Sequence, residues 1–111
     1  MEVGFRNARL AKLCTDPSSR RRRLGEGRAR KLLLRLNQMT AATNLDELRA
    51  LPQARCHQLE ADRDEQFSLD LDGPWRLVVE IADDPIPRRL DGGIALHEVE
   101  RLTIIDIIDP H

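Results

Sequence analysis

Cysteine is scarce in this chain. The two cysteines, Cys14 and Cys56, lie far apart, and neither has the close pair spacing that is typical of zinc or redox sites. We therefore expect both side chains to be small buried hydrophobes, and we expect no bound metal.

The sequence also lacks long apolar runs. No run approaches the ~18 residues that a membrane-spanning helix needs. Residues 1–5 do not form a basic segment followed by an apolar one, as a secretory signal would. We therefore expect a cytoplasmic protein with no membrane partner.

There is almost no net charge. Lys and Arg total 18 and Asp and Glu total 19, so the formal charge of −1 gives no overall attraction to nucleic acid. The distribution is uneven, because residues 6–35 are mostly basic and the chain after Asp62 is mostly acidic. Such a dipolar molecule can hold a polyanion on one face, although a solvated run of charge is the simpler interpretation.

With 111 residues, of which 41% are hydrophobic and 33% charged, the chain is typical of one globular domain. We expect a single domain over residues 1–111. Its first half is predicted to be mostly helical. Alternation over 2–6 predicts a strand, and Asn7 then caps a short helix that ends near Asp16.

A stripe of apolar residues at helical spacing predicts the main helix over about 28–42. Asn44, with Glu47 three residues later, predicts the cap of a last short helix. The members of the stripe are Ala29, Leu32, Leu33, Leu36 and Met39.

The second half changes to a period of two. Residues 67–71 and 75–81 alternate around Gly73 and Pro74, which predicts a β-hairpin. Residues 55–59 and 102–108 favour two more strands, the latter apolar on both faces, and 83–93 favours an exposed loop. The predicted class is therefore α+β, with the N-terminal strand and a basic helical half packed on an antiparallel or mixed sheet of about four further, C-terminal strands.

One segment carries a family resemblance. Residues 55–77, RCHQLEADRDEQFSLDLDGPWRL, and the terminal Asp109-Pro110-His111 resemble the killer-protein (HigB-type) branch of the RelE/ParE toxin superfamily. In that branch a strand R-x-H-x-L-x-x-D-R precedes a strand pair containing G-x-W/Y-R, and the chain ends in an acidic residue, a tyrosine and a histidine. The order of the predicted elements matches as well, so the resemblance implies a RelE-like fold over the whole chain.

The resemblance also implies a function. Members of this branch are toxins that pair with a helix-turn-helix antitoxin and cut messenger RNA in the ribosomal A site. There the ribose 2′-OH attacks the adjacent phosphate, which needs a base, an acid and cations for the developing charge. The implied partners are the antitoxin, the ribosome and mRNA, and no metal or other cofactor is required.

Four residues fall on the family's catalytic positions: His57, Arg76, Asp109 and His111. The two histidines are the implied proton carriers, because histidine serves as acid or base near neutral pH. The forked guanidinium of Arg76 suits the phosphate, and Asp109 is placed to orient a histidine. The alternatives are a hydrogen-bonded structural His57, an Arg76 that pairs with Glu80, and a frayed terminus at His111.

Candidate RNA-binding residues are all arginines. Arg63 suits a phosphate, although Asp62 and Asp64 flank it. A run of four consecutive arginines is the other candidate, and the alternative interpretation of this run is a solvated surface. Trp75 is expected in the core rather than as a base-stacking platform. The run consists of Arg20, Arg21, Arg22 and Arg23.

Two positions depart from the family pattern. Glu60 stands where the family usually has a lysine, and Pro110 stands where it has a tyrosine. A carboxylate repels a phosphate, and proline cannot stack on a base. The alternative function is therefore a catalytically weakened binding module that pairs with an antitoxin without cleaving RNA. A third candidate function, gyrase inhibition as in the ParE branch, has less support, because that branch does not need the histidines.

Overall fold

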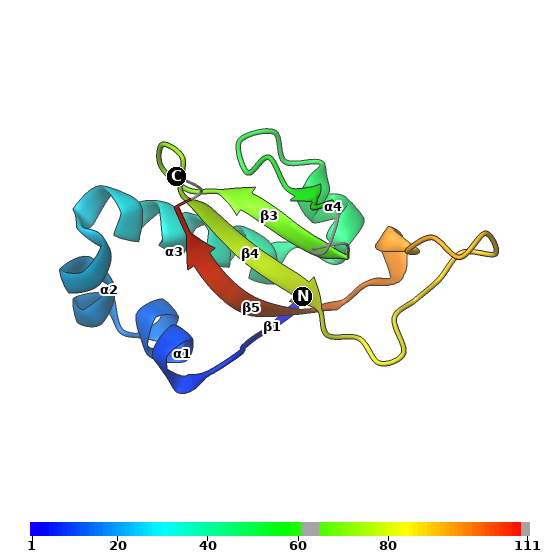
Figure 1. Ribbon diagram of the computed structural model, residues 1–111, viewed down its shortest axis with the longest axis horizontal. Helices are drawn as coiled ribbons and strands as arrows, with labels where there is room; N and C mark the ends of the chain where they lie inside the picture. The colour runs from blue at the N-terminus through cyan, green and yellow to red at the C-terminus, as the bar shows by residue number, and fades with distance from the viewer. Residues whose placement is uncertain (61–64, 110–111) are drawn as a thin grey trace.

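The computed structural model describes residues 1–60 and 65–109. In these residues, α3 and α4 cover one face of a five-stranded sheet, and α1 and α2 lie at one end of the molecule (Figure 1). The helices are α1 (Ala8–Thr15), α2 (Pro17–Leu24), α3 (Glu26–Ala41) and α4 (Leu45–Arg49), with a 3₁₀ turn η2 (Leu96–Glu98). The strands are β1 (Glu2–Phe5), β2 (His57–Gln58), β3 (Gln66–Asp70), β4 (Arg76–Ile81) and β5 (Arg101–Ile108).

Side-chain caps set the starts of α1, α2 and α4. The Asn7 side chain accepts a hydrogen bond from the Leu10 amide at 2.9 Å, and Asn44 accepts one from the Glu47 amide at 2.8 Å. Both predicted caps are therefore confirmed. The helix α2, which contains the arginine run, was not predicted. Its start follows from the Asp16 side chain, which caps the Ser18 amide, and from Pro17 at the first helical position.

The sheet is mixed. Its strand order is β1-β5-β4-β3-β2, and β1 runs parallel to β5 while the other neighbours are antiparallel. The predicted hairpin is confirmed as β3 and β4, with Leu69 opposite Leu77. The four C-terminal strands β2 to β5 pair antiparallel with one another, as predicted, and the predicted N-terminal strand makes the sheet mixed because it joins β5 in parallel. Strand β2 is shorter than the predicted 55–59.

The main hydrophobic core lies between α3, α4 and one face of the sheet. Phe67 and Leu77 from the hairpin and Leu32 and Met39 from α3 are completely buried there. The predicted helical stripe is correct except for Leu33, which is 41% exposed. The stripe turns slightly along the helix, so that an arginine, Arg35, lies on the buried side instead.

The side chain of Arg35 is the largest fully buried one in the described residues, with 2% of its surface exposed. Its Nε donates to the Asp70 carbonyl at 2.6 Å, and its Nη2 donates to the Gln53 carbonyl at 2.8 Å. Burial lowers the pKa of Arg35, and the Asp70 carboxylate acts in the opposite direction. Arg35 therefore ties α3 to the end of β3 and to the segment before β2.

Both cysteines are buried, as predicted. Burial raises the pKa of Cys14 to about 11 and that of Cys56 to about 12, against smaller opposing effects of Arg20 and Arg49. Because the thiolate is the reactive form, we expect neither cysteine to react with iodoacetamide at pH 7.5 in the folded protein and both to react in urea. Mass spectrometry checks this, and fast labelling without urea would contradict it.

Within residues 1–60 and 65–109, no helix is long and apolar enough to cross a bilayer.

Candidate functional site

The face of the sheet opposite α3 carries the motif residues. In the strand register His57 pairs with Ser68, and Arg76 pairs with Asp70. Paired residues of antiparallel strands share a face, and so do residues two apart on one strand. These four residues therefore lie on one face of the sheet, which we call the open face. Their strand neighbours Phe67, Leu69 and Leu77 point to the core on the other face.

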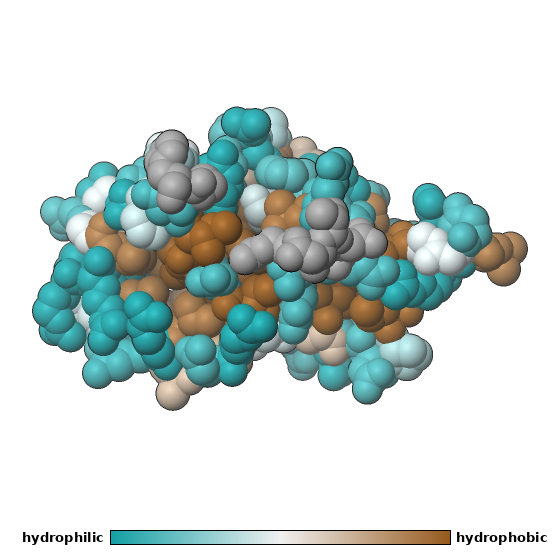
Figure 2. All heavy atoms as spheres, viewed as in Figure 1, coloured by the Kyte–Doolittle hydropathy of each residue, from teal (hydrophilic) through white to brown (hydrophobic). Residues whose placement is uncertain are grey.

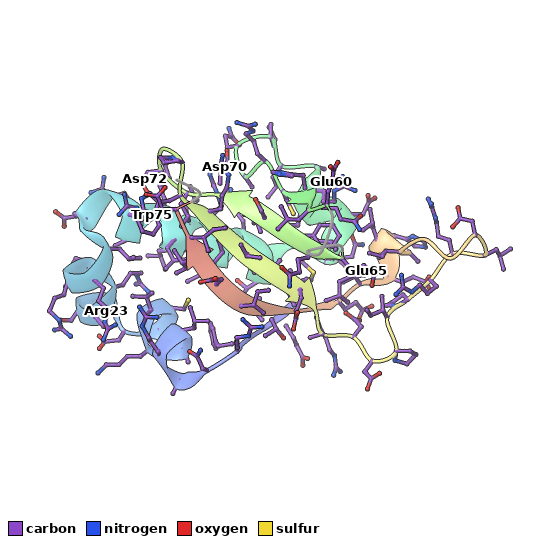
Figure 3. All side chains as sticks on the ribbon, viewed as in Figure 1. Arg23, Glu60, Glu65, Asp70, Asp72 and Trp75 are labelled. Carbon is purple, nitrogen blue, oxygen red and sulfur yellow. The ribbon has the colours of Figure 1, made fainter. Side chains whose placement is uncertain are left out.

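Apolar surface follows the middle of this face, and hydrophilic residues surround it, most densely over α2 (Figure 2). Among the charged motif residues, Asp70 is the last residue of β3 and Arg76 the first of β4. Figure 3 shows Asp70 at this end of β3, beside the β3–β4 turn.

Asp70 is the centre of an arginine clamp, by which we mean Arg55, Asp70 and Arg76. Its carboxylate lies 3.1 Å from Arg76 Nε and 3.4 Å from Arg55 Nη1. The Asp70 amide also donates to the Ala54 carbonyl at 2.8 Å, which continues the β2–β3 pairing to the position of Arg55. Two guanidinium groups thus share one carboxylate, and the clamp keeps a net positive charge.

The orientation of Arg76 is fixed. Its Nη1 donates to the Trp75 carbonyl at 3.0 Å and to the Gly73 carbonyl at 3.3 Å, while Nη2 makes neither bond. About a quarter of the side chain is exposed, 26%. The ion pair that the sequence left open is made with Asp70 across the hairpin rather than with Glu80 along the strand. The guanidinium of Arg76 is therefore fixed by several contacts, while its side chain remains partly exposed at the surface.

Arg55 was not among the predicted site residues. Its side chain is 69% exposed at the edge of the sheet, and its backbone has a positive φ of 45°. A non-glycine residue at such a φ is uncommon, and here it turns the chain into the first residues of β2. The only sequence signal was its place at the start of the R-x-H motif, two residues before His57.

His57 is exposed on the edge strand β2. Its Nδ1 lies 2.9 Å from the Arg55 carbonyl oxygen. Because a carbonyl can only accept a hydrogen bond, Nδ1 is the donor in this contact, and Nε2 is the ring nitrogen that remains for a substrate. This arrangement suits a group that accepts a proton from a substrate hydroxyl.

His57 and Arg76 are neighbours across the open face but do not touch each other. They lie two strands apart laterally and two residues apart along the strands, which corresponds to ~12 Å between their Cα atoms. Ser68 lies between them in register, and its side chain is buried.

The remaining predicted catalytic residues are at the C-terminus. Asp109 is exposed and directly follows Ile108, which pairs with Arg76 in the β4–β5 register. Asp109 is therefore next in sequence to the residue that pairs with Arg76. His111 lies outside the described residues, as do Pro110 and the predicted RNA-binding Arg63.

The predicted arginine run divides into two kinds of residue. Arg20 is only 5% exposed, and its Nη1 donates to the Cys14 carbonyl at 2.8 Å. Its prediction as an RNA contact was wrong, because the side chain satisfies the C-terminal end of α1. Arg21, Arg22 and Arg23 are exposed on α2, beyond β5 and away from the edge strand β2 (Figure 1).

No group of three or more His, Cys, Asp or Glu side chains is placed to hold a metal ion in the described part of the chain. Two carboxylates near the candidate site are engaged by arginines. Asp70 pairs with Arg55 and Arg76, and Asp72 pairs with Arg28 at 2.8 Å.

Comparison with known proteins identifies the family. Among curated proteins, none matches this chain. The family model of HigB-like toxins, described as the RelE-like toxin of the type II toxin–antitoxin system HigB, matches residues 3–91. The match includes His57 and all of the arginine clamp, and it ends before β5 and Asp109. The α+β architecture with its mixed sheet is consistent with the RelE-like fold. The chain therefore belongs to the HigB-like toxins of type II toxin–antitoxin systems.

Proposed function

We propose that this toxin is a ribosome-dependent mRNA endoribonuclease. The observation that carries the proposal is the exposed ring of His57, whose Nδ1 lies against the Arg55 carbonyl, on the same face as the arginine clamp. In the proposed reaction His57 takes the proton of a ribose 2′-OH, and the 2′-oxygen attacks the adjacent phosphorus. The bond from phosphorus to the 5′-oxygen breaks, which leaves a 2′,3′-cyclic phosphate and a 5′-hydroxyl.

The clamp supplies the positive charge for this step. Charge builds on the phosphate oxygens as the 2′-oxygen approaches, and donors fixed in advance stabilise it most effectively. Asp70 and two backbone carbonyls hold Arg76 in place, and Arg55 adds a second guanidinium. With His57 as the base, we assign protonation of the leaving 5′-oxygen to His111, the other histidine at a family position, and the orientation of a catalytic histidine to Asp109.

The proposed partners follow from this activity. The family implies an antitoxin, and we propose that it is of the helix-turn-helix type. Ribosomes and mRNA are the proposed targets, so the proposed site of action is the cytoplasm.

Induction of this chain in growing cells tests the proposal. We expect growth to stop, and we expect mapping of 5′ ends to find new ends with a 5′-hydroxyl inside open reading frames. Coexpression of the antitoxin should abolish both effects. Normal growth, with soluble toxin and without new ends, would contradict the enzyme function.

A second candidate function is a binding module that pairs with the antitoxin without cleaving RNA. Two observations favour it. Asp70 already engages both clamp arginines, and the exposed Glu60, two residues after β2, stands where the family usually has a lysine. Stable binding of the antitoxin, together with no cleavage by purified toxin on programmed ribosomes, would establish this function instead.

A further inference from the structure

A cleft opens between the first two helices and the end of the sheet. It has a volume of about 400 Å³. Its walls come from α1, α2, the residue before β4, and β5, so segments that are distant in the sequence meet there. The side chains on which the inference rests are Arg9, Leu10, Leu13, Arg23, Trp75 and Asp106.

The aromatic wall of the cleft is rigid. The guanidinium of Arg28 lies over the Trp75 ring, 4.1 Å from its centroid. Arg28 is itself held by Asp72, with 2.8 Å from Nε to Oδ1 and 3.2 Å from Nη2 to Oδ2. Trp75 packs against the core, as predicted, but it is only partly buried and lines the cleft. It lies at the end of the sheet nearest the helix that carries Arg23 (Figure 3).

The cleft also has both signs of charge. Asp106 pairs with Val78 in the register, so it lies on the open face two residues from the position opposite Arg76. Its Oδ1 accepts a hydrogen bond from the Ile107 amide at 2.9 Å, and that bond leaves Oδ2 for another donor. Arg9 and Arg23 are exposed, and neither forms an ion pair with another described residue.

We infer that this cleft binds one nucleotide of the RNA and selects guanine. An aromatic wall stacks on any base, and unpaired arginines attract the phosphates on either side. The Asp106 carboxylate accepts only, and guanine presents two adjacent donors, N1–H and the N2 amino group. Adenine presents an acceptor at N1, which a carboxylate repels. The inference rests on the proposed function, since it takes RNA as the substrate.

The cleft and the proposed cleavage site include residues of the same face of the sheet. His57 and Asp106 belong to the same row across the sheet, through Ser68 and Val78. Three strand spacings separate them, or ~14 Å. The guanosine bound in the cleft is therefore not the nucleotide whose 2′-OH reacts at His57. It sets the position of the cut along the message.

The single tryptophan of the chain makes this testable, because its fluorescence reports occupancy of the cleft. GMP, AMP, CMP and UMP are titrated at low salt. We expect GMP to quench Trp75 and to bind about tenfold more tightly than AMP, since paired base contacts discriminate by about that factor.

Three variants separate the contacts. Asp106→Asn should remove the preference for GMP, because an amide also donates. Arg9→Ala should lower the affinity for all four nucleotides several-fold, because it removes a phosphate contact. Lys12→Ala is the matched control, since Lys12 is an exposed cation of α1 outside the cleft and should change nothing.

Equal binding of the four nucleotides, or no quenching at millimolar concentrations, overturns the inference. Quenching by the antitoxin but by no nucleotide also overturns it, and makes the cleft a protein-binding surface. The proposed function is judged separately, by mapping cuts made by the wild type and by Asp106→Asn. If Asp106→Asn cleaves with the same sequence preference as the wild type, the inference about the cleft is refuted and the proposed function stands. If the protein binds GMP selectively but cleaves no mRNA, the proposed enzymatic function is refuted and the inference about the cleft stands.

Discussion

Replacing His57 with alanine is expected to lower the rate of ribosome-dependent mRNA cleavage by about 10²- to 10⁴-fold, the usual contribution of a general base. The reason is geometric. The Arg55 carbonyl holds the proton on Nδ1 and leaves Nε2 to take the proton of the 2′-OH. Single-turnover cleavage of mRNA on programmed ribosomes, with toxin in excess, measures the chemical step.

The matched control for this variant is His97→Ala. His97 is also exposed, but it lies in η2 and not on β2. We expect it to cleave at the wild-type rate. Because His57 is a surface residue, its loss should change the free energy of unfolding by no more than ~0.5 kcal/mol. A fully active His57→Ala protein would show that another group is the base.

Replacing Arg35 with alanine is expected to lower the free energy of unfolding by ~3 kcal/mol or more. A buried hydrogen bond to a charged group commonly contributes ~1.5 to 3 kcal/mol, and Arg35 makes three. Its removal also leaves the Asp70 and Gln53 carbonyls without their donor. The total stability of a domain is only ~5 to 15 kcal/mol, so the loss is a large fraction of it.

Urea denaturation followed by Trp75 fluorescence measures this effect. Arg30→Ala is the control, because Arg30 lies on the exposed side of the same helix and should cost less than ~0.5 kcal/mol. The free energy of unfolding of Arg35→Lys should lie between those of the wild type and Arg35→Ala, since one ammonium group cannot reach all three acceptors. Equal stability of Arg35→Ala and Arg30→Ala would mean that water replaces the buried guanidinium.

The sequence alone determined the elements whose signals are local. Residues close together in the sequence were enough to predict three features. These are the caps at Asn7 and Asn44, the helical stripe of α3, and the alternation of the β3–β4 hairpin. The ordered motifs between Arg55 and Leu77 also pointed to the toxin family. Such signals survive without tertiary information because capping and hairpin pairing involve near neighbours.

The arginines show where local signals fail. Arg20 and Arg35 belong to a charged, basic part of the sequence, and their charge predicts exposure. Each is buried because backbone carbonyls from another segment or the preceding helix converge on its guanidinium. That convergence depends on how the segments meet and cannot be seen in the residue type.

The tertiary structure alone decided the composition of the site. Parallel pairing of β1 with β5 joins the two ends of the chain, and antiparallel pairing brings Arg55 and Arg76 to the same carboxylate of Asp70. The cleft between α1, α2 and Trp75 likewise exists only once the helices pack at the end of the sheet. The physical reason is that a local pattern specifies which face of an element is apolar, whereas strand order and register depend on contacts between residues far apart in the sequence.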